Sequence, residues 1–171
     1  MKMQRMRLYG ILVMKILIQL AHSIGRTFKK LFQLPQNNKE IDSGAGFVLY
    51  KKEESLLILC LIKESGVLDL PKGHSNPEDL NVFTTAQREC FEEAGIFVSV
   101  QDLITKDVYQ ADNLTMFCAV TDQHVEIGFN PVTKKIEHVG YVWLKPNEAI
   151  DSLPEYLTKA IIWSLQFVSN T

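Results

Sequence analysis

A helical pattern of apolar positions is clearest between residues 84 and 94. Ala86, Cys90 and Ala94 recur every four residues, and neither proline nor glycine interrupts the segment. Apolar side chains at this spacing lie on one face of an α-helix. Gly95 follows directly, and glycine commonly ends helices in the left-handed conformation. The pattern therefore predicts a helix over residues 84–94 with one buried face.

Near the start of the chain, polar residues recur at steps of three and four. From residue 11 to residue 32 these polar positions are Lys15, Gln19, His22, Arg26 and Lys29, with mostly apolar residues between them. This spacing predicts a basic amphipathic helix. Charges interrupt it too often for a transmembrane helix, which needs about 20 mostly apolar residues. Residues 35–42 (PQNNKEID) then predict a linker.

Short apolar runs between turn residues predict a β-sheet in the middle of the chain. Residues 47–52 and 56–64 are separated by a Glu-Glu-Ser turn, which predicts a hairpin. Further strands are expected over residues 97–100, 102–109, 114–120, 125–127 and 141–144. This order of strands and helices indicates an α+β fold with a mixed sheet flanked by helices.

The end of the chain predicts another helix. Ser152 and Glu155 have the spacing of a capping box, with serine as the N-cap and glutamate three residues later. The apolar stripe expected to face the core consists of Leu153, Leu157, Ile161 and Leu165.

Charge is distributed unevenly along the 171 residues. Residues 1–40 carry eight Lys or Arg and one acidic residue, a charge of +7. Residues 41–171 carry ten basic and nineteen acidic residues, a charge of −9. We therefore expect a basic extension and linker over residues 1–40 and one domain over residues 41–171. Because the domain is acidic, we do not expect it to bind duplex nucleic acid.

The three cysteines, Cys60, Cys90 and Cys118, lie far apart in apolar stretches. They form neither a CxxC metal-binding pair nor a disulfide framework, which favours a reducing compartment. We expect them to be small buried side chains in a cytoplasmic protein. The alternative is targeting to an organelle or a membrane, through contact of residues 8–34 with an import machinery or an anionic surface. Two further alternatives stay open: the N-terminal segment docks on the domain, or it is a poorly ordered extension.

Three glutamates fall on one face of the helix predicted over residues 84–94. Glu89, Glu92 and Glu93 are spaced i, i+3 and i+4, so their carboxylates project from the same side. Like charges this close are unfavourable unless a cation neutralises them, and Arg88 compensates only part. Carboxylate oxygens bind hard divalent cations, so the cluster favours Mg²⁺ or Mn²⁺. If spacing is the only evidence, the alternative to a metal site is that the glutamates form a solvated acidic face of the helix.

The residues around this cluster resemble the Nudix box, a loop–helix–loop of the form G-x5-E-x7-R-E-U-x-E-E-x-G-U with U apolar. Gly73 matches the first glycine, and residues 88–96 (RECFEEAGI) match the second half without a mismatch. The first half departs twice. Asp79 stands where the family has glutamate, and eight residues rather than seven separate it from Arg88. We expect an extra loop residue to absorb this shift, with Glu78 or Asp79 in the orienting position.

This resemblance implies a sheet sandwiched between helices and the chemistry of a metal-dependent hydrolase. It implies that Glu89, Glu92, Glu93 and the carbonyl of Gly73 bind the metal ions, and that Arg88 orients the glutamates. These residues then form the expected catalytic and metal-binding set.

A second segment resembles the asymmetrical diadenosine tetraphosphate hydrolases of this family. It is residues 137–144 (EHVGYVWL), preceded in the chain by PKGH and VEI segments. The resemblance implies that Glu137 lies near the metals as a ligand or general base. Lys72 and His74 are candidate phosphate contacts, and Trp143 is expected in the core. The sequence LDLPKGH departs from the aromatic-Thr-Pro-Pro-Lys-Gly-His of animal members.

The expected activity is metal-dependent hydrolysis of a diphosphate bond in a small nucleotide. Diadenosine tetraphosphate, cut to ATP and AMP, is the favoured substrate, and Tyr109, Phe117 and Tyr141 are candidates for the ring that stacks on adenine. The alternatives within the family are a nucleoside triphosphate pyrophosphatase and an RNA 5′-pyrophosphohydrolase. The alternative of another class is an inactive nucleotide-binding module.

Overall fold

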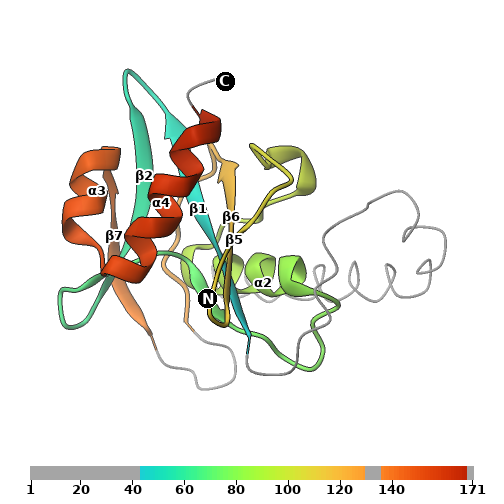
Figure 1. Ribbon diagram of the computed structural model, residues 1–171. Helices are drawn as coiled ribbons and strands as arrows, with labels where there is room; N and C mark the ends of the chain where they lie inside the picture. Colours follow the sequence, from blue (N-terminus) through green and yellow to red (C-terminus); the bar gives the residue numbers. More distant parts are fainter. Residues whose placement is uncertain (1–42, 130–135, 169–171) are drawn as a thin grey trace. The chain divides into compact units, whose positions relative to one another are not determined.

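A seven-stranded β-sheet lies at the centre of the computed structural model, which describes residues 43–129 and 136–168 (Figure 1). The strands are β1 (Gly44–Lys52), β2 (Leu56–Lys63), β3 (Leu68–Asp69), β4 (Lys72–His74), β5 (Tyr109–Ala111), β6 (Leu114–Val120) and β7 (His138–Leu144). The helices are α2 (Val82–Ala94), α3 (Pro146–Ser152) and α4 (Glu155–Val168), with a short 3₁₀ helix η2 (Val100–Asp102). The helix expected over residues 11–32 and the boundary at residue 40 lie outside the described residues.

Strand β1 connects the two halves of the sheet. It pairs antiparallel with β2 and β4 and parallel with β6. Strand β2 also pairs with β3 and β7, and β5 pairs with β6. The sheet is therefore mixed, and both the α+β class and the β1–β2 hairpin are confirmed. The β1–β4 register places Gly73 opposite Ala45.

Helices α3 and α4 cover one face of the sheet (Figure 1). Val48 and Tyr50 of β1 and Ile58 and Cys60 of β2 contribute to the core on this side. The buried helix residues that meet them are Ala149, Leu153, Leu157, Ala160, Ile161 and Val168. The expected apolar stripe therefore faces the core, as the helical spacing indicates. A short side-chain hydrogen bond of 2.6 Å also joins Tyr50 to Ser164.

Helix α2 packs on the opposite face of the sheet, against β1. The contact is aromatic, because the rings of Phe47, Phe83 and Phe117 meet with centroid separations of 5.2–5.9 Å. Alternate residues of a strand point to opposite faces, which is why Phe47 faces α2 while Val48 faces the other core. The aromatic cluster holds the acid-bearing helix against the centre of the sheet.

The ends of α2 are defined by side-chain and backbone caps. The Asn81 side chain accepts hydrogen bonds from the backbone N–H groups of Phe83 and Thr84, and the Thr84 hydroxyl accepts from the Asn81 N–H. At the other end Gly95 has φ of 71°, the left-handed conformation that glycine adopts without strain. The structure thus confirms the helix and its C-terminal end, and extends its start to Val82.

Three of the strand predictions after α2 are wrong. Residues 97–100 and 102–109 form no long strands, because the Asp102 carboxylate accepts from the backbone N–H and hydroxyl of Ser99 and closes the turn at η2. Residues 125–127 form no strand either. The N–H of Glu126 donates to the Ala94 carbonyl instead, so this segment provides a hydrogen bond to the last turn of α2 and does not pair with a strand.

The predicted cap of the last helix is also wrong. Ser152 is the final residue of α3, a helix that the sequence pattern did not reveal, and α4 begins at Glu155. Pro146 at the start of α3 has the position where proline fits a helix best.

The prediction that the cysteines are unpaired and buried is confirmed for Cys60, Cys90 and Cys118. Burial raises the pKa of each thiol, which disfavours the reactive thiolate. Among the helices of residues 43–129 and 136–168, none is both long and apolar enough to cross a bilayer.

These caps generate a stability prediction. Asn81→Ala removes the acceptor for two backbone N–H groups and should lower the free energy of unfolding by about 1 kcal/mol. Ser152→Ala, at an exposed helix end, should change it by less than about 0.5 kcal/mol. Urea unfolding followed by circular dichroism measures both values. Equal losses in the two variants would contradict the observed helix boundaries.

Candidate active site

Arg88 of α2 connects most of the polar groups at the site. Its Nε and Nη2 donate to the two carboxylate oxygens of Asp79, at 3.1 and 3.0 Å. Its Nη1 donates to Glu89 at 2.7 Å and to Glu92 at 3.3 Å. Nη2 also donates to the backbone carbonyl of His74 at 2.7 Å. One guanidinium therefore ties the loop before α2, the acidic face of α2 and strand β4 together.

Asp79 takes the orienting position that the sequence left open between two acids. In addition to the hydrogen bonds from Arg88, its carboxylate accepts a hydrogen bond of 2.9 Å from the Asn76 N–H and one of 2.9 Å from the Thr85 hydroxyl. Glu78 is exposed. The additional loop residue therefore leaves the shorter aspartate within reach of the arginine.

Glu93 occupies the most buried position of the acidic cluster. It is 9% exposed, and its Oε2 accepts a 2.9 Å hydrogen bond from the backbone N–H of Lys72 in β4. Its Oε1 lies 3.6 Å from Nδ1 of His138. Burial raises the pKa of Glu93 to about 9, although the Lys72 N–H opposes this shift. An isolated carboxylate here would be protonated at neutral pH, so its anionic form needs a cation nearby.

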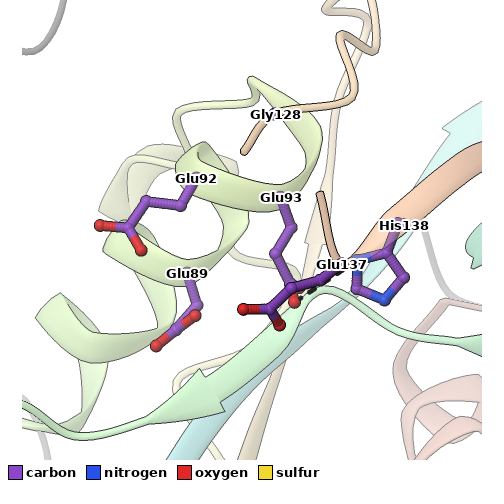
Figure 2. Close-up of a pocket in the computed structure, with 6 residues that line it drawn as sticks. All are labelled: Glu89, Glu92, Glu93, Gly128, Glu137 and His138. Atoms are coloured by element: carbon purple, nitrogen blue, oxygen red, sulfur yellow. Dashed lines mark ion pairs between the residues drawn. The ribbon is translucent and has the colours of Figure 1, made fainter. Parts of the chain in front are cut away.

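The acids line one small pocket, shown in Figure 2. Glu89, Glu92 and Glu93 reach it from α2, while Glu137 and His138 reach it from the start of β7 (Figure 2). The structure thus brings Glu137 to the α2 glutamates, although 44 positions separate it from Glu93 in the chain. Burial raises the pKa of Glu89 and Glu92 too, against the lowering effect of Arg88.

Two glycines allow the backbone to approach these acids. A Cβ atom on Gly73 would overlap the carboxylate of Glu89, and one on Gly128 would overlap the backbone carbonyl of Glu92. Gly128 also donates its N–H to the Glu93 carbonyl at 3.1 Å. The absence of a side chain at Gly73 therefore leaves its backbone beside a carboxylate, as the expected metal-binding role requires.

The expected phosphate contacts differ in their surroundings. The Lys72 ammonium pairs with Asp69 at 2.9 Å, and the Lys72 side chain is only 16% exposed. The His74 side chain is exposed, while its carbonyl is bound by Arg88. Lys72 is therefore already paired, and His74 is the more accessible of the two.

The expected base-stacking residues lie at separate places. Tyr141 is 37% exposed on β7 and is an accessible ring. Tyr109 is partly buried and contacts Trp163 of α4, with ring centroids 6.1 Å apart. Phe117 is 1% exposed within the aromatic cluster under α2, so its proposed stacking role is wrong.

The expectation that Trp143 lies in the core is wrong, because its side chain is only partly buried. The Lys51 ammonium lies 5.7 Å from the centroid of its ring.

Sequence reasoning missed two buried polar residues beside Glu93. Asp69 is 2% exposed and accepts ion pairs from Lys72 and Lys63. His138 is 2% exposed, and neither ring nitrogen has a hydrogen-bond partner. The available signal for Asp69 was a lone acid between Leu68 and Leu70, where an apolar strand residue would be ordinary.

The donor set of the pocket fits a hard divalent cation. Glu89, Glu92, Glu93 and Glu137 all line the pocket, and a cation there would relieve the cost of burying these charges. Within the part of the chain that the structure describes, no three acidic or histidine side chains converge on one point. Arg88 binds one oxygen of Glu89 and one of Glu92, so the second oxygen of each carboxylate is the one that would face an ion.

Solved structures show the same fold. The binary complex of the C. elegans Ap4A hydrolase has a TM-score of 0.58 and 20% identity, covering 77% of this chain and 100% of that chain. The E. coli dihydroneopterin triphosphate pyrophosphohydrolase has a TM-score of 0.54 and 18% identity, covering 78% and 100%. RenU, a Nudix hydrolase from M. smegmatis, has a TM-score of 0.54 and 14% identity, covering 76% and 87%.

The fold is an α+β sandwich with a mixed sheet between helices and an acidic pocket on one helix face. The family model of the NUDIX domain matches residues 41–163, while a comparison with curated proteins finds no match. The chain belongs to the Nudix family and is a Nudix pyrophosphohydrolase. Nudix hydrolases generally use a divalent metal such as Mg²⁺ and act on small-molecule nucleotides.

The buried acids generate the first prediction for this site. Glu92→Gln or Glu93→Gln should lower kcat by roughly 10²–10⁴-fold, the range for loss of a catalytic carboxylate. The fold should persist, because removing one of several close negative charges relieves repulsion. Steady-state kinetics and thermal unfolding measure the two effects. Activity near that of the wild type in either variant would contradict the assignment.

The hydrogen bonds of Arg88 generate the second prediction for this site. Asp79→Asn should lower kcat by about 10–100-fold, because Arg88 loses its bidentate partner and orients the glutamates less well. Glu78→Gln is the matched control in the same loop and should leave kcat unchanged. Similar losses in the two variants would show that loop charge, rather than the Asp79–Arg88 contact, matters.

Proposed function

We propose that this protein uses Mg²⁺ or Mn²⁺ to hydrolyse a diphosphate bond in a nucleotide, with Glu89, Glu92, Glu93 and the Gly73 carbonyl as metal ligands. The bound metal would neutralise phosphate charge and lower the pKa of a water molecule. The observation that carries this proposal is the buried acidic face of α2, organised by Arg88 and placed beside Gly73.

The protein's own groups complete the chemistry. A carboxylate oxygen of Glu89 or Glu137 accepts the proton of the attacking water as it bonds to phosphorus. The P–O bond to the leaving phosphate then breaks, and the leaving oxygen takes a proton from solvent. Arg88 keeps Glu89 oriented through its 2.7 Å hydrogen bond.

The favoured substrate is a bis(5′-nucleosyl)-tetraphosphate, cut asymmetrically so that diadenosine tetraphosphate yields ATP and AMP. The support is the likeness of residues 137–144 to the corresponding segment of such hydrolases, together with the fold shared with the C. elegans Ap4A hydrolase. Tyr141 supplies an accessible ring for adenine, and His74 supplies an exposed imidazole for phosphate. The sequence also predicts Tyr109 and Lys72 as substrate contacts, but Tyr109 is partly buried and the Lys72 ammonium is already paired with Asp69.

A substrate panel tests this proposal. The full chain with Mg²⁺ or Mn²⁺ should release ATP and AMP from diadenosine tetraphosphate with a higher kcat/KM than for other nucleotides. Tyr141→Ala should raise KM about tenfold, because one base–aromatic stack contributes about 1–3 kcal/mol. Chromatography of the products distinguishes the ATP and AMP pair from two ADP molecules.

Three outcomes of the same panel would overturn the choice of substrate. A higher kcat/KM on a nucleoside triphosphate would favour a pyrophosphatase, and one on triphosphorylated RNA would favour a 5′-pyrophosphohydrolase. Tight binding without any product, across the panel, would favour a nucleotide-binding module.

A further inference from the structure

We infer that Asp69 is a positioning residue for Glu93, acting through Lys72 and His138. This inference rests on the proposed function, because it concerns the acid expected to bind the metal. Asp69 lies at the end of β3, is 2% exposed and is one of the most buried charged residues described. It lies before Gly73 and therefore outside the Nudix box, and no motif assigns it a role.

Asp69 anchors the residue that holds one oxygen of Glu93. Its Oδ2 accepts the Lys72 ammonium at 2.9 Å, and the backbone N–H of the same lysine donates to Glu93 Oε2 at 2.9 Å. The ion pair therefore fixes the Lys72 side chain on one side of β4 while its peptide group faces Glu93. A freely moving Lys72 side chain would leave this strand edge less well defined.

Asp69 also faces the residue beside the other oxygen of Glu93. The His138 ring lies between the two acids, with Nε2 3.8 Å from Asp69 Oδ2 and Nδ1 3.6 Å from Glu93 Oε1. His138 is 2% exposed and has no hydrogen-bond partner at either nitrogen. Small movements toward either acid would satisfy it, and a carboxylate behind a histidine sets the ring's orientation in many metal sites.

Together these contacts hold both carboxylate oxygens of Glu93. Oε2 accepts from Lys72, whose ammonium pairs with Asp69, and Oε1 faces His138, whose other ring nitrogen faces Asp69. Burial would raise the pKa of Asp69, but His138, Lys72 and Lys63 lower it well below its usual range. Asp69 is therefore anionic at neutral pH and, at the distances above, pairs with the Lys72 ammonium.

This arrangement also gives Lys72 a different role from direct phosphate binding. A phosphate-binding lysine contributes mainly to substrate affinity, so its loss raises KM. A lysine that acts through Glu93 contributes to metal binding and to kcat, so its loss leaves KM largely unchanged.

The test compares Asp69→Asn with Lys63→Gln in the full chain. The Lys63 ammonium contacts the same oxygen of Asp69 at 2.7 Å, but its side chain is 43% exposed. Asp69→Asn should weaken Mn²⁺ binding, measured by calorimetry without substrate, by about 10–100-fold. It should lower kcat by about tenfold or more and change the KM for diadenosine tetraphosphate by less than about twofold. Lys63→Gln should stay within about twofold of the wild type in all three quantities.

The double variant Asp69→Asn/Lys72→Met guards against misfolding of the single variant. Replacing both members of a buried ion pair is often neutral for stability, whereas removing one leaves the other unpaired. The double variant should show the same loss of Mn²⁺ affinity as Asp69→Asn alone, because Asp69→Asn already removes the anchor of the Lys72 side chain and Lys72→Met removes nothing further. Thermal unfolding of each variant accompanies the binding measurement.

Several results would overturn the inference. These are unchanged Mn²⁺ affinity in Asp69→Asn or the double variant, an equal loss in Lys63→Gln, or a Lys72→Met variant with raised KM and normal kcat. If wild-type protein binds Mn²⁺ and Asp69→Asn weakens that binding while no nucleotide is cleaved, the positioning role stands and the proposed function fails. If hydrolysis occurs and Asp69→Asn leaves it unchanged, the function stands and the positioning role fails.

Discussion

The site depends on how a cluster of half-buried carboxylates is held on one helix face. Arg88 provides the main contact, because its planar guanidinium donates to Asp79, Glu89, Glu92 and the carbonyl of His74 at once. A lysine has a single nitrogen and cannot span groups on a loop, a helix and a strand in this way. The relative positions of these three elements are therefore coupled to the charge balance of the pocket.

The sheet contributes the other residues that surround this cluster of carboxylates. Strand β4 pairs with β1 and brings Gly73 over the helix, while β7 pairs with β2 and brings Glu137 and His138 to the same pocket. The aromatic contact of Phe47 with Phe83 holds α2 against β1. Hydrophobic packing thus sets the distances at which the polar groups can meet, and buried ion pairs refine them.

Local spacing was sufficient for the elements whose partners are close in sequence. The α2 helix follows from apolar residues four apart and from Gly95, and the β1–β2 hairpin follows from two apolar runs around a short turn. Patterns failed where distant groups compete for the backbone. The N–H of Glu126 meets the carbonyl of Ala94 rather than a strand, and Ser152 ends one helix instead of capping the next.

The sequence by itself determined the family, the α+β class and the glutamates on one helix face, because residues three and four apart on a helix share a side wherever the helix is placed. Only the tertiary structure decided which acid meets Arg88, that Lys72 is paired with Asp69, and that His138 lies beside Glu93. Those contacts join strands and helices far apart in the chain. Their geometry depends on sheet register and core packing, which residue spacing does not specify.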